Sequence, residues 1–188
     1  MIDENERVIL VSECDEDLGA AQKLDVHRSG ALHRAFSVIL FDDHGRVLLQ
    51  RRAASKYHSP ALWSNTCCGH PRPGESTIGA AARRLHEEMG VTSKLIPLFS
   101  FIYRADLRGG LVEHELDHVF VGQTADFPCH DRTEVDEWRW IEMNATRLWL
   151  QREPQAFTAW FAPVFAESVI FYHARSNMAH GGTRRRSS

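Results

Sequence analysis

The sequence predicts an α/β fold in which a mixed β-sheet is sandwiched between α-helices. Apolar runs of strand length lie before and after one central helical segment, and further helical segments close the chain. With 188 residues and 43% hydrophobic content, the chain can bury one good core, so we expect a single domain over residues 1–175. Residues 176–188 are polar, glycine-containing and basic, and they predict a disordered tail.

The first half of the chain contains three segments with strand character. Residues 6–11 predict a short strand, followed by an acidic turn over residues 12–17. Residues 35–41 form a nearly continuous apolar run, which is typical of a buried strand. A turn at residues 42–45 and a return strand at residues 46–50 complete a predicted hairpin.

The central helix lies in the stretch from Trp63 to Val91. Ser76 or Thr77 is expected to cap its start, and Gly90 its end. Five apolar residues recur at helical spacing and predict one buried stripe. They are Ile78, Ala81, Ala82, Leu85 and Met89.

Three more strands and two helices are expected after the central helix. The strands cover residues 95–103, 111–123 and 137–141. Asn144 is expected to cap a short helix that ends at Arg152, because Pro154 breaks the pattern there. Residues 157–173 predict a longer apolar and aromatic helix.

Charge and composition argue against several classes of protein. A formal net charge of −3 does not suggest a nucleic-acid binder. No apolar run approaches membrane-spanning length, and the acidic start of the chain lacks the basic region of a secretory signal. We therefore expect a cytoplasmic protein that binds neither nucleic acid nor membrane. The four cysteines show no CxxC pair, which argues against a zinc ribbon and a disulfide scaffold.

The helix also carries a charged face, with Arg83 one turn before Glu87 and Arg84 one turn before Glu88. Such a face is most often only a solvated surface. Here, however, the run from Gly69 through Glu75 to residues 83–91 resembles the Nudix box, GX5EX7REUXEEXGU, in which U is apolar. Arg84 departs from it, because the box has its first helix glutamate there. In the Nudix family the helix carboxylates hold divalent metal against a diphosphate, so this replacement argues against hydrolysis.

Three further motifs narrow the resemblance to one branch of the Nudix superfamily. Residues 68–71 (CGHP) open the box, residues 32–37 (LHRAFS) lie upstream, and residues 112–115 (VEHE) lie downstream. Together they resemble type I isopentenyl-diphosphate isomerases, over about residues 5–165. The resemblance implies a Nudix-type fold and an enzyme of isoprenoid biosynthesis. It would interconvert isopentenyl diphosphate and dimethylallyl diphosphate by metal-dependent protonation and deprotonation.

The resemblance implies a metal site of three histidines and two carboxylates. The matching residues are His27, His33, His70, Glu113 and Glu115. Glu113 and Glu115 are two positions apart on a predicted strand, so both project from one face, although such a pair alone is often solvent-facing. These ligand types suit Zn²⁺, Mn²⁺ or Mg²⁺. The resemblance adds a second, substrate-bridging Mg²⁺ held by Glu88.

A shift of a double bond needs one proton added and another removed, so two groups must act on the substrate. The resemblance implies Cys68 and Glu115, with Tyr103 contacting the glutamate, and the order of the two transfers stays open. Strand alternation places Cys67 and Cys68 on opposite faces, and we expect Cys67 to be a small buried hydrophobe. A cationic intermediate needs a dry aromatic pocket. Trp160 matches the aromatic stabiliser of the family, with helix packing as the alternative.

A diphosphate requires cationic side chains around it. The basic residues expected to bind it are Lys23, Arg51, Lys56 and Arg84. The partner is therefore a small-molecule diphosphate, and we expect a monomer or weak dimer. Two other hypotheses remain at this point: a Nudix hydrolase that cleaves a nucleoside or other diphosphate, and a catalytically silent metal- or diphosphate-binding module.

Overall fold

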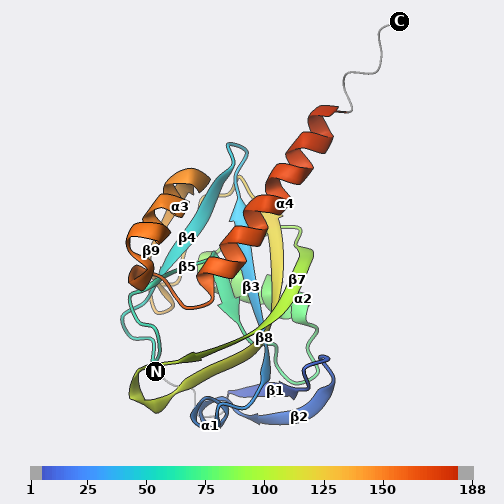
Figure 1. The fold of residues 1–188 in the computed structure, drawn as a ribbon, viewed down its shortest axis with the longest axis vertical. Helices are drawn as coiled ribbons and strands as arrows, with labels where there is room; N and C mark the ends of the chain where they lie inside the picture. The colour runs from blue at the N-terminus through green and yellow to red at the C-terminus, as the bar shows by residue number, and fades with distance from the viewer. Residues whose placement is uncertain (1–5, 182–188) are drawn as a thin grey trace, which may run out of the picture.

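In the computed structural model, which describes residues 6–181, nine strands form one mixed sheet with helices on both sides (Figure 1). The strands are β1 (Arg7–Val11), β2 (Asp17–Gln22), β3 (His33–Phe41), β4 (Arg46–Arg52), β5 (Trp63–Ser64), β6 (Cys67–Gly69), β7 (Ile96–Asp106), β8 (Val112–Gln123) and β9 (Val135–Glu142). The helices are α1 (Lys23–Ser29), α2 (Thr77–Met89), α3 (Met143–Arg152) and α4 (Phe161–Gly181), with 3-10 turns η1 (Arg108–Gly110) and η2 (Pro154–Ala156). The predicted fold class is thus confirmed.

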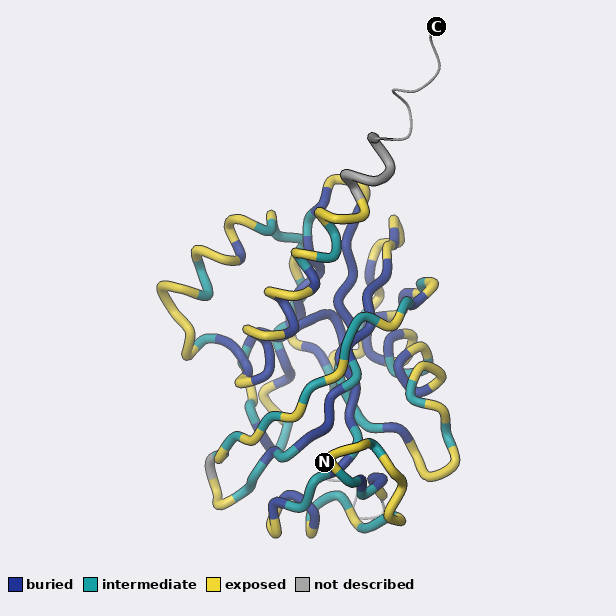
Figure 2. Tube along the Cα trace, turned by 45° about the vertical axis from the view of Figure 1, so that its right-hand side comes forward, coloured by how far each residue is buried: buried dark blue, intermediate teal, exposed yellow. Residues whose placement is uncertain are grey.

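Strand β3 is the centre of the sheet. It pairs in parallel with β8 along its whole length and antiparallel with β1, β4 and β6. Phe36, Val38 and Leu40 pack in the core cluster that contains α2, whereas Ile39 and Phe41 pack in the cluster that contains α4. Figure 2 shows this buried path through the middle of the molecule. The apolar run is nearly continuous because helices cover both faces of the strand.

Helix α2 is capped as predicted. The Ser76 hydroxyl accepts a hydrogen bond from the backbone N–H of Gly79, and Gly90 ends the helix in the left-handed conformation with φ of 67°. The predicted stripe needs a correction, because Ile78 and Ala82 are exposed. The buried residues are Ala80, Ala81, Leu85, Glu88 and Met89. The buried face is therefore rotated about the helix axis relative to the predicted stripe. It includes Glu88, whose carboxylate accepts hydrogen bonds from Gln50 and Arg84.

Two elements near the start of the chain were not predicted. β2 forms a hairpin with β1, and α1 follows it, ending at Gly30 with φ of 67°. The sequence of β2, DLGAAQ, shows little alternation because this edge strand is largely exposed. Figure 1 shows that β1, β2 and α1 lie together at one end of the sheet.

The C-terminal helices begin at other residues than predicted. Asn144 does not cap α3: it lies within the first turn, where its side chain accepts a hydrogen bond from Arg147. α4 starts at Phe161 rather than at residue 157, because the Thr158 N–H donates to the carbonyl of Trp63 and holds that segment extended. The predicted tail starts within α4, since residues 176–181 are helical, and residues 182–188 lie outside the described residues. None of the helices within residues 6–181 has the length and apolar character needed to cross a membrane.

Glu75 ties the loop before α2 to the helix itself, and this contact predicts a pH-dependent stability. Arg83 donates two hydrogen bonds to the Glu75 carboxylate, at 2.7 and 2.8 Å, and these lower the pKa of Glu75 to about 2. The stabilisation is therefore present above pH 4.5, the ordinary pKa of the group, and is lost as the pH falls toward 2.

We expect Glu75→Gln to lower the free energy of unfolding by about 0.5–1 kcal/mol at pH 7, because the contact is partly solvent-exposed. The difference from the wild type should shrink between pH 4.5 and 3 in urea titrations. A difference that stays constant over this range would contradict the assignment of the effect to the ionised carboxylate.

Candidate active site and metal centre

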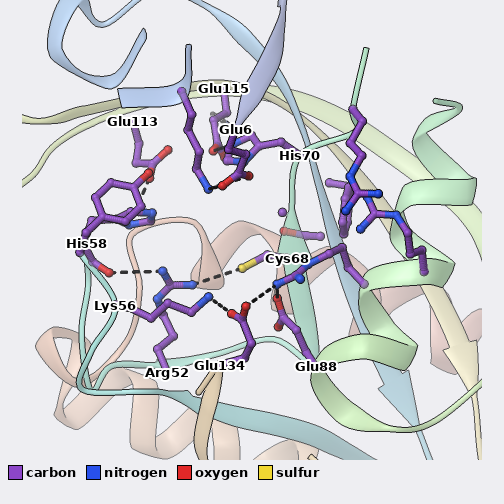
Figure 3. A pocket seen from close by; sticks show the side chains of 18 of the residues that line it. Glu6, Arg52, Lys56, His58, Cys68, His70, Glu88, Glu113, Glu115 and Glu134 are labelled. Atoms are coloured by element: carbon purple, nitrogen blue, oxygen red, sulfur yellow. Dashed lines mark hydrogen bonds and ion pairs between the residues drawn. The ribbon is translucent and has the colours of Figure 1, made fainter. Parts of the chain in front are cut away.

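A cavity of 1040 Å³ opens at the edge of the sheet, between α2, the ends of β3, β6 and β8, and the loop after β4. Figure 3 shows Glu113, Glu115 and His70 along one side of it, and Arg52 and Lys56 on the opposite side. The thiol of Cys68 lies between the two groups in this view. The cavity therefore has an imidazole-carboxylate side and a cationic side, with a thiol between them.

The structure brings the five predicted metal ligands into one cluster. One nitrogen or carboxylate oxygen from each lies within 4.8 Å of the others, and all five residues are buried. They are His27 on α1, His33 at the start of β3, His70 after β6, and Glu113 and Glu115 on β8. The parallel pairing of β3 with β8 places His33 directly beside Glu115, which explains how residues so distant in sequence meet.

Backbone carbonyls orient two of the imidazoles. His27 Nδ1 lies 2.6 Å from the carbonyl of Lys23, and His33 Nδ1 lies 3.0 Å from that of Ala31. A carbonyl can only accept, so each Nδ1 carries the proton and each Nε2 is left with its lone pair. His33 Nε2 lies 3.2 Å from His70 Nε2, which in turn lies 2.8 Å from Glu115 Oε1. The Nε2 atoms of the three histidines thus point toward one place, as metal ligands do.

Unpartnered buried atoms test whether a cation fits here. Among the described residues, His27 Nε2 and both carboxylate oxygens of Glu113 have no hydrogen-bond partner, although they are fully buried. Burying such atoms without a partner is costly. Burial and the neighbouring charge of Glu115 raise the pKa of Glu113 well above its usual range, which a cation would reverse. The residues present therefore fit a divalent metal ion held by imidazole and carboxylate.

Cys68 and Cys67 occupy different environments. Cys68 lines the cavity, 3.7 Å from an Arg52 nitrogen, whereas Cys67 is fully buried in the core beside α2. Burial raises the pKa of the Cys68 thiol to about 12, against the lowering effect of Arg52. The thiol therefore keeps its proton at neutral pH. Strand alternation along β6 separates the two sulfurs as the sequence predicted.

Glu115 carries the other reactive group. Burial raises its pKa, but the neighbouring imidazoles of His33 and His70 lower it more, so the pKa of Glu115 lies well below its usual range. Its second oxygen accepts a hydrogen bond of 2.5 Å from the hydroxyl of Tyr103. The carboxylate is thus ionised, oriented from two sides, and placed on the wall of the same cavity as Cys68.

Trp160 forms an aromatic wall of the cavity. Its indole N–H donates to the side-chain oxygen of Asn65 at 3.1 Å, which fixes the ring. The ring centroid lies 6.2 Å from that of Tyr103 and 5.7 Å from the guanidinium carbon of Arg52. Trp160 is also 3% exposed and packs against Val164, so packing and a role in the cavity coexist.

Three of the four predicted basic residues line the cavity. Lys23 pairs with Glu6, Lys56 pairs with Glu134, and Arg84 pairs with acidic residues of α2 and with Glu134. The carboxylates Glu88 and Glu134 also line it, so the cations are held in place by charge.

Arg51 lies apart from the other three predicted residues. Its guanidinium pairs with Asp136 and Glu137 rather than with groups of the cavity. Arg52 lines the cavity instead, because side chains alternate along β4 and Arg52 shares the face of Gln50, which donates to Glu88. The strand predicted at residues 46–50 ended before both arginines, and its alternation, continued to Arg52 as in β4, was the signal that could have distinguished them.

The sequence also gave no reason to select His58, whose Nδ1 lies 3.2 Å from Glu113. It lies in the loop between β4 and β5, where no periodicity relates a residue to the site.

The fold and the loop–helix unit of α2 define a NUDIX domain, and the family model of the NUDIX domain matches residues 31–161. Solved structures share the fold: a Deinococcus radiodurans protein (TM-score 0.67, 21% identity, 87% of this chain and 98% of that one) and a MutT protein from Methanosarcina mazei (TM-score 0.62, 19% identity, 76% and 95%). At these identities the likeness concerns the fold alone.

Relatives of higher identity show to which branch of the NUDIX proteins the chain belongs. The chain is 52% identical to an isopentenyl-diphosphate Delta-isomerase of Nocardia farcinica, over 84% of this chain and 91% of that protein. It is 49% identical to isopentenyl-diphosphate Delta-isomerase 2 of Aromatoleum aromaticum, over 84% and 83%. The chain therefore belongs to the isopentenyl-diphosphate Delta-isomerase family of NUDIX proteins.

The different positions of Arg51 and Arg52 predict different effects on anion binding. We expect Arg52→Ala to weaken the binding of inorganic diphosphate by about 10- to 100-fold, because a charged hydrogen bond is worth roughly 1.5–3 kcal/mol. Arg51→Ala should change it by less than about threefold, since that side chain lies outside the cavity. Isothermal titration calorimetry with magnesium diphosphate measures both, and a larger loss in Arg51→Ala would contradict the assignment.

Proposed function

We propose that the protein interconverts isopentenyl diphosphate and dimethylallyl diphosphate, by adding a proton at one carbon and removing one from another. The observation that carries the proposal is the pair of Cys68 and Glu115 in one cavity, beside the ring of Trp160. Its relatives are named for this reaction. The site thus supplies a proton donor and a proton acceptor in a cavity that is partly lined by an aromatic ring.

The protonation states suit a double-bond shift. Burial leaves the Cys68 thiol protonated, while the Glu115 carboxylate is ionised, so one group can give a proton and the other can take one. After the shift the two groups have exchanged states, and proton exchange with solvent restores them before the next turnover. Tyr103, whose hydroxyl donates to Glu115, keeps the carboxylate in position during the transfer.

Protonation of a branched alkene places positive charge on a tertiary carbon, which water would capture. Trp160 would stabilise this charge with the face of its indole ring, and the buried wall around it excludes water. The hydrogen bond from the indole N–H to Asn65 keeps the ring in one orientation. We therefore assign to Trp160 the stabilisation of the cationic intermediate, in addition to its packing against the core.

The diphosphate would bind on the opposite, cationic side of the cavity. Arg52, Lys56 and Arg84 supply the positive charges there, whereas Lys23 lines the cavity on the metal side, where it pairs with Glu6. Glu88 is 3% exposed and lines the cavity, so it would hold a Mg²⁺ that supplies positive charge to the substrate diphosphate. The other divalent ion, Mn²⁺, Zn²⁺ or Mg²⁺, would be held by the cluster of three histidines and two glutamates. When bound, it supplies positive charge that keeps Glu115 ionised and oriented.

Arg84 disfavours hydrolysis at this site. Arg84 stands where the Nudix box has its first helix glutamate, so the helix has one metal-binding carboxylate fewer, and the Arg84 guanidinium pairs with Glu87, Glu88 and Glu134. A hydrolase of this fold class needs the helix carboxylates to hold metal against the diphosphate. Here the helix instead offers a cation toward the cavity, which suits holding the diphosphate intact.

The function is tested by proton NMR of the purified protein with Mg²⁺ and isopentenyl diphosphate in D₂O. We expect the methyl and olefinic signals of dimethylallyl diphosphate, with deuterium at the carbons that exchange. Released phosphate would favour the hydrolase. The absence of any reaction with Mg²⁺, Mn²⁺ or Zn²⁺ would favour a binding module.

The two neighbouring cysteines give a matched pair of variants. Cys68→Ala should lower kcat by about 10²–10⁴-fold, because it removes one of the two proton-transfer groups. Cys67→Ala should keep most of the activity, since its sulfur is buried away from the cavity. The same NMR assay measures both, and an equal loss in the two variants would refute the assignment of the thiol.

A further inference from the structure

The loop between β4 and β5, residues 53–62, carries a buried histidine that the mechanism has not used. His58 is 8% exposed, and its Nδ1 is fully buried without a hydrogen-bond partner among the described residues. That atom lies 3.2 Å from Glu113 Oε1. Figure 3 shows the imidazole and the Glu113 carboxylate facing each other at the rim of the cavity. A buried polar atom pointed at a metal-ligand carboxylate suggests a role in that site.

The contacts of Glu113 divide its two oxygens between different partners. Oε2 faces His27 Nε2 at 3.3 Å, whereas Oε1 faces His58. His58 is absent from the group of ligand atoms that lie within 4.8 Å of one another. Opposite ligands of one ion lie only about 4.2–4.6 Å apart at ordinary metal–ligand distances of roughly 2.1–2.3 Å. His58 is therefore placed outside the coordination shell, on the oxygen that points away from His27.

The backbone of the loop holds the ring in this position. Ser59 and Ala61 adopt the left-handed conformation, with φ of 47° and 59°, which L-residues rarely adopt without support. Arg52 gives that support, because its guanidinium donates to the carbonyls of His58 and Ser59, each at 3.2 Å. The chain also closes on itself through the N–H of Ala61 and the carbonyl of Arg52.

We propose that His58 is a positioning residue for the metal site: with the ion bound, its Nδ1–H would donate to Glu113 Oε1, 3.2 Å away, and so present Oε2 to the ion. The inference rests on the metal centre proposed above. Because the carbonyl of His58 also receives Arg52, this one residue connects the metal side of the cavity with its cationic side. Removal of such an outer partner typically costs about 10- to 100-fold in metal affinity.

The experiment is a titration of the metal-free protein with Co²⁺, followed by its d–d absorption, without substrate. His58→Ala should raise the dissociation constant of the first equivalent by about 10- to 100-fold. His58→Asn should stay within about threefold of the wild type, because its amide can donate a hydrogen bond from nearly the same place. The neighbouring Tyr57→Phe is the control, since the Tyr57 hydroxyl has no partner among the described residues and should not affect affinity.

A double variant shows whether His58 acts through Glu113. In the background of Glu113→Gln, adding His58→Ala should weaken Co²⁺ binding by less than about threefold further. The Co²⁺ d–d absorption bands should have the same positions in the wild type and in His58→Asn, because His58 is not itself a metal ligand. An unchanged affinity in His58→Ala, an equal loss in both backgrounds, or failure of Asn to restore binding would overturn the proposal.

The titration is independent of the reaction. If the wild type binds no Co²⁺, the metal centre and the role of His58 both fail. If it binds and the variants behave as expected, the role of His58 stands even when the NMR assay shows no isomerisation. Thermal unfolding of each metal-free variant shows whether it has folded, and a loss of stability with unchanged affinity would mean that His58 is structural.

Discussion

The parallel pairing of β3 with β8 is the interaction on which the rest of the structure depends. It extends from His33 beside Glu115 to Phe41 beside Gln123, so one register fixes both the core and the metal ligands. A shift by one residue would turn every side chain of the strand to the other face. The apolar residues of β3 would then face the wrong helices, and His33 would leave the cluster. The stability of the core thus selects the geometry of the site.

Burial produces the chemistry of the cavity as well as its shape. Removal of water raises the pKa of Cys68 and Glu113, while close imidazoles lower that of Glu115. The two glutamates, which would both be ionised in neutral water, therefore differ in their tendency to hold a proton within one cavity. This burial costs free energy, because atoms of His27 and Glu113 are buried without a hydrogen-bond partner, and a divalent ion would supply that partner.

The acidic and basic groups on the cationic side form a connected arrangement. Arg84 links α2 to Glu134, which also pairs with Lys56 from the loop after β4. Arg52 extends this arrangement to the thiol of Cys68 and to the carbonyl of His58. The segments proposed to bind the diphosphate are thus held by contacts that also reach the thiol and the loop that carries His58.

The elements with strong periodicity or marked ends were predictable. The central helix with Ser76 and Gly90 at its ends, the buried strand at residues 35–41 and the hairpin after it follow from local rules. The exposed strand β2 and the short helix α1 were not, because neither buries a regular apolar face. The start of α4 depends on a hydrogen bond from Thr158 to Trp63, which no local pattern shows.

The sequence by itself determined the fold class, the family motifs and the residue types that suit metal, proton transfer and diphosphate. Only the tertiary structure decided that Arg52 rather than Arg51 enters the cavity, that Glu88 turns inward, and that His58 meets Glu113. The physical reason is that each of these choices depends on partners far away in the chain. A strand or helix pattern tells which side chains share a face, but packing against other segments decides where that face points.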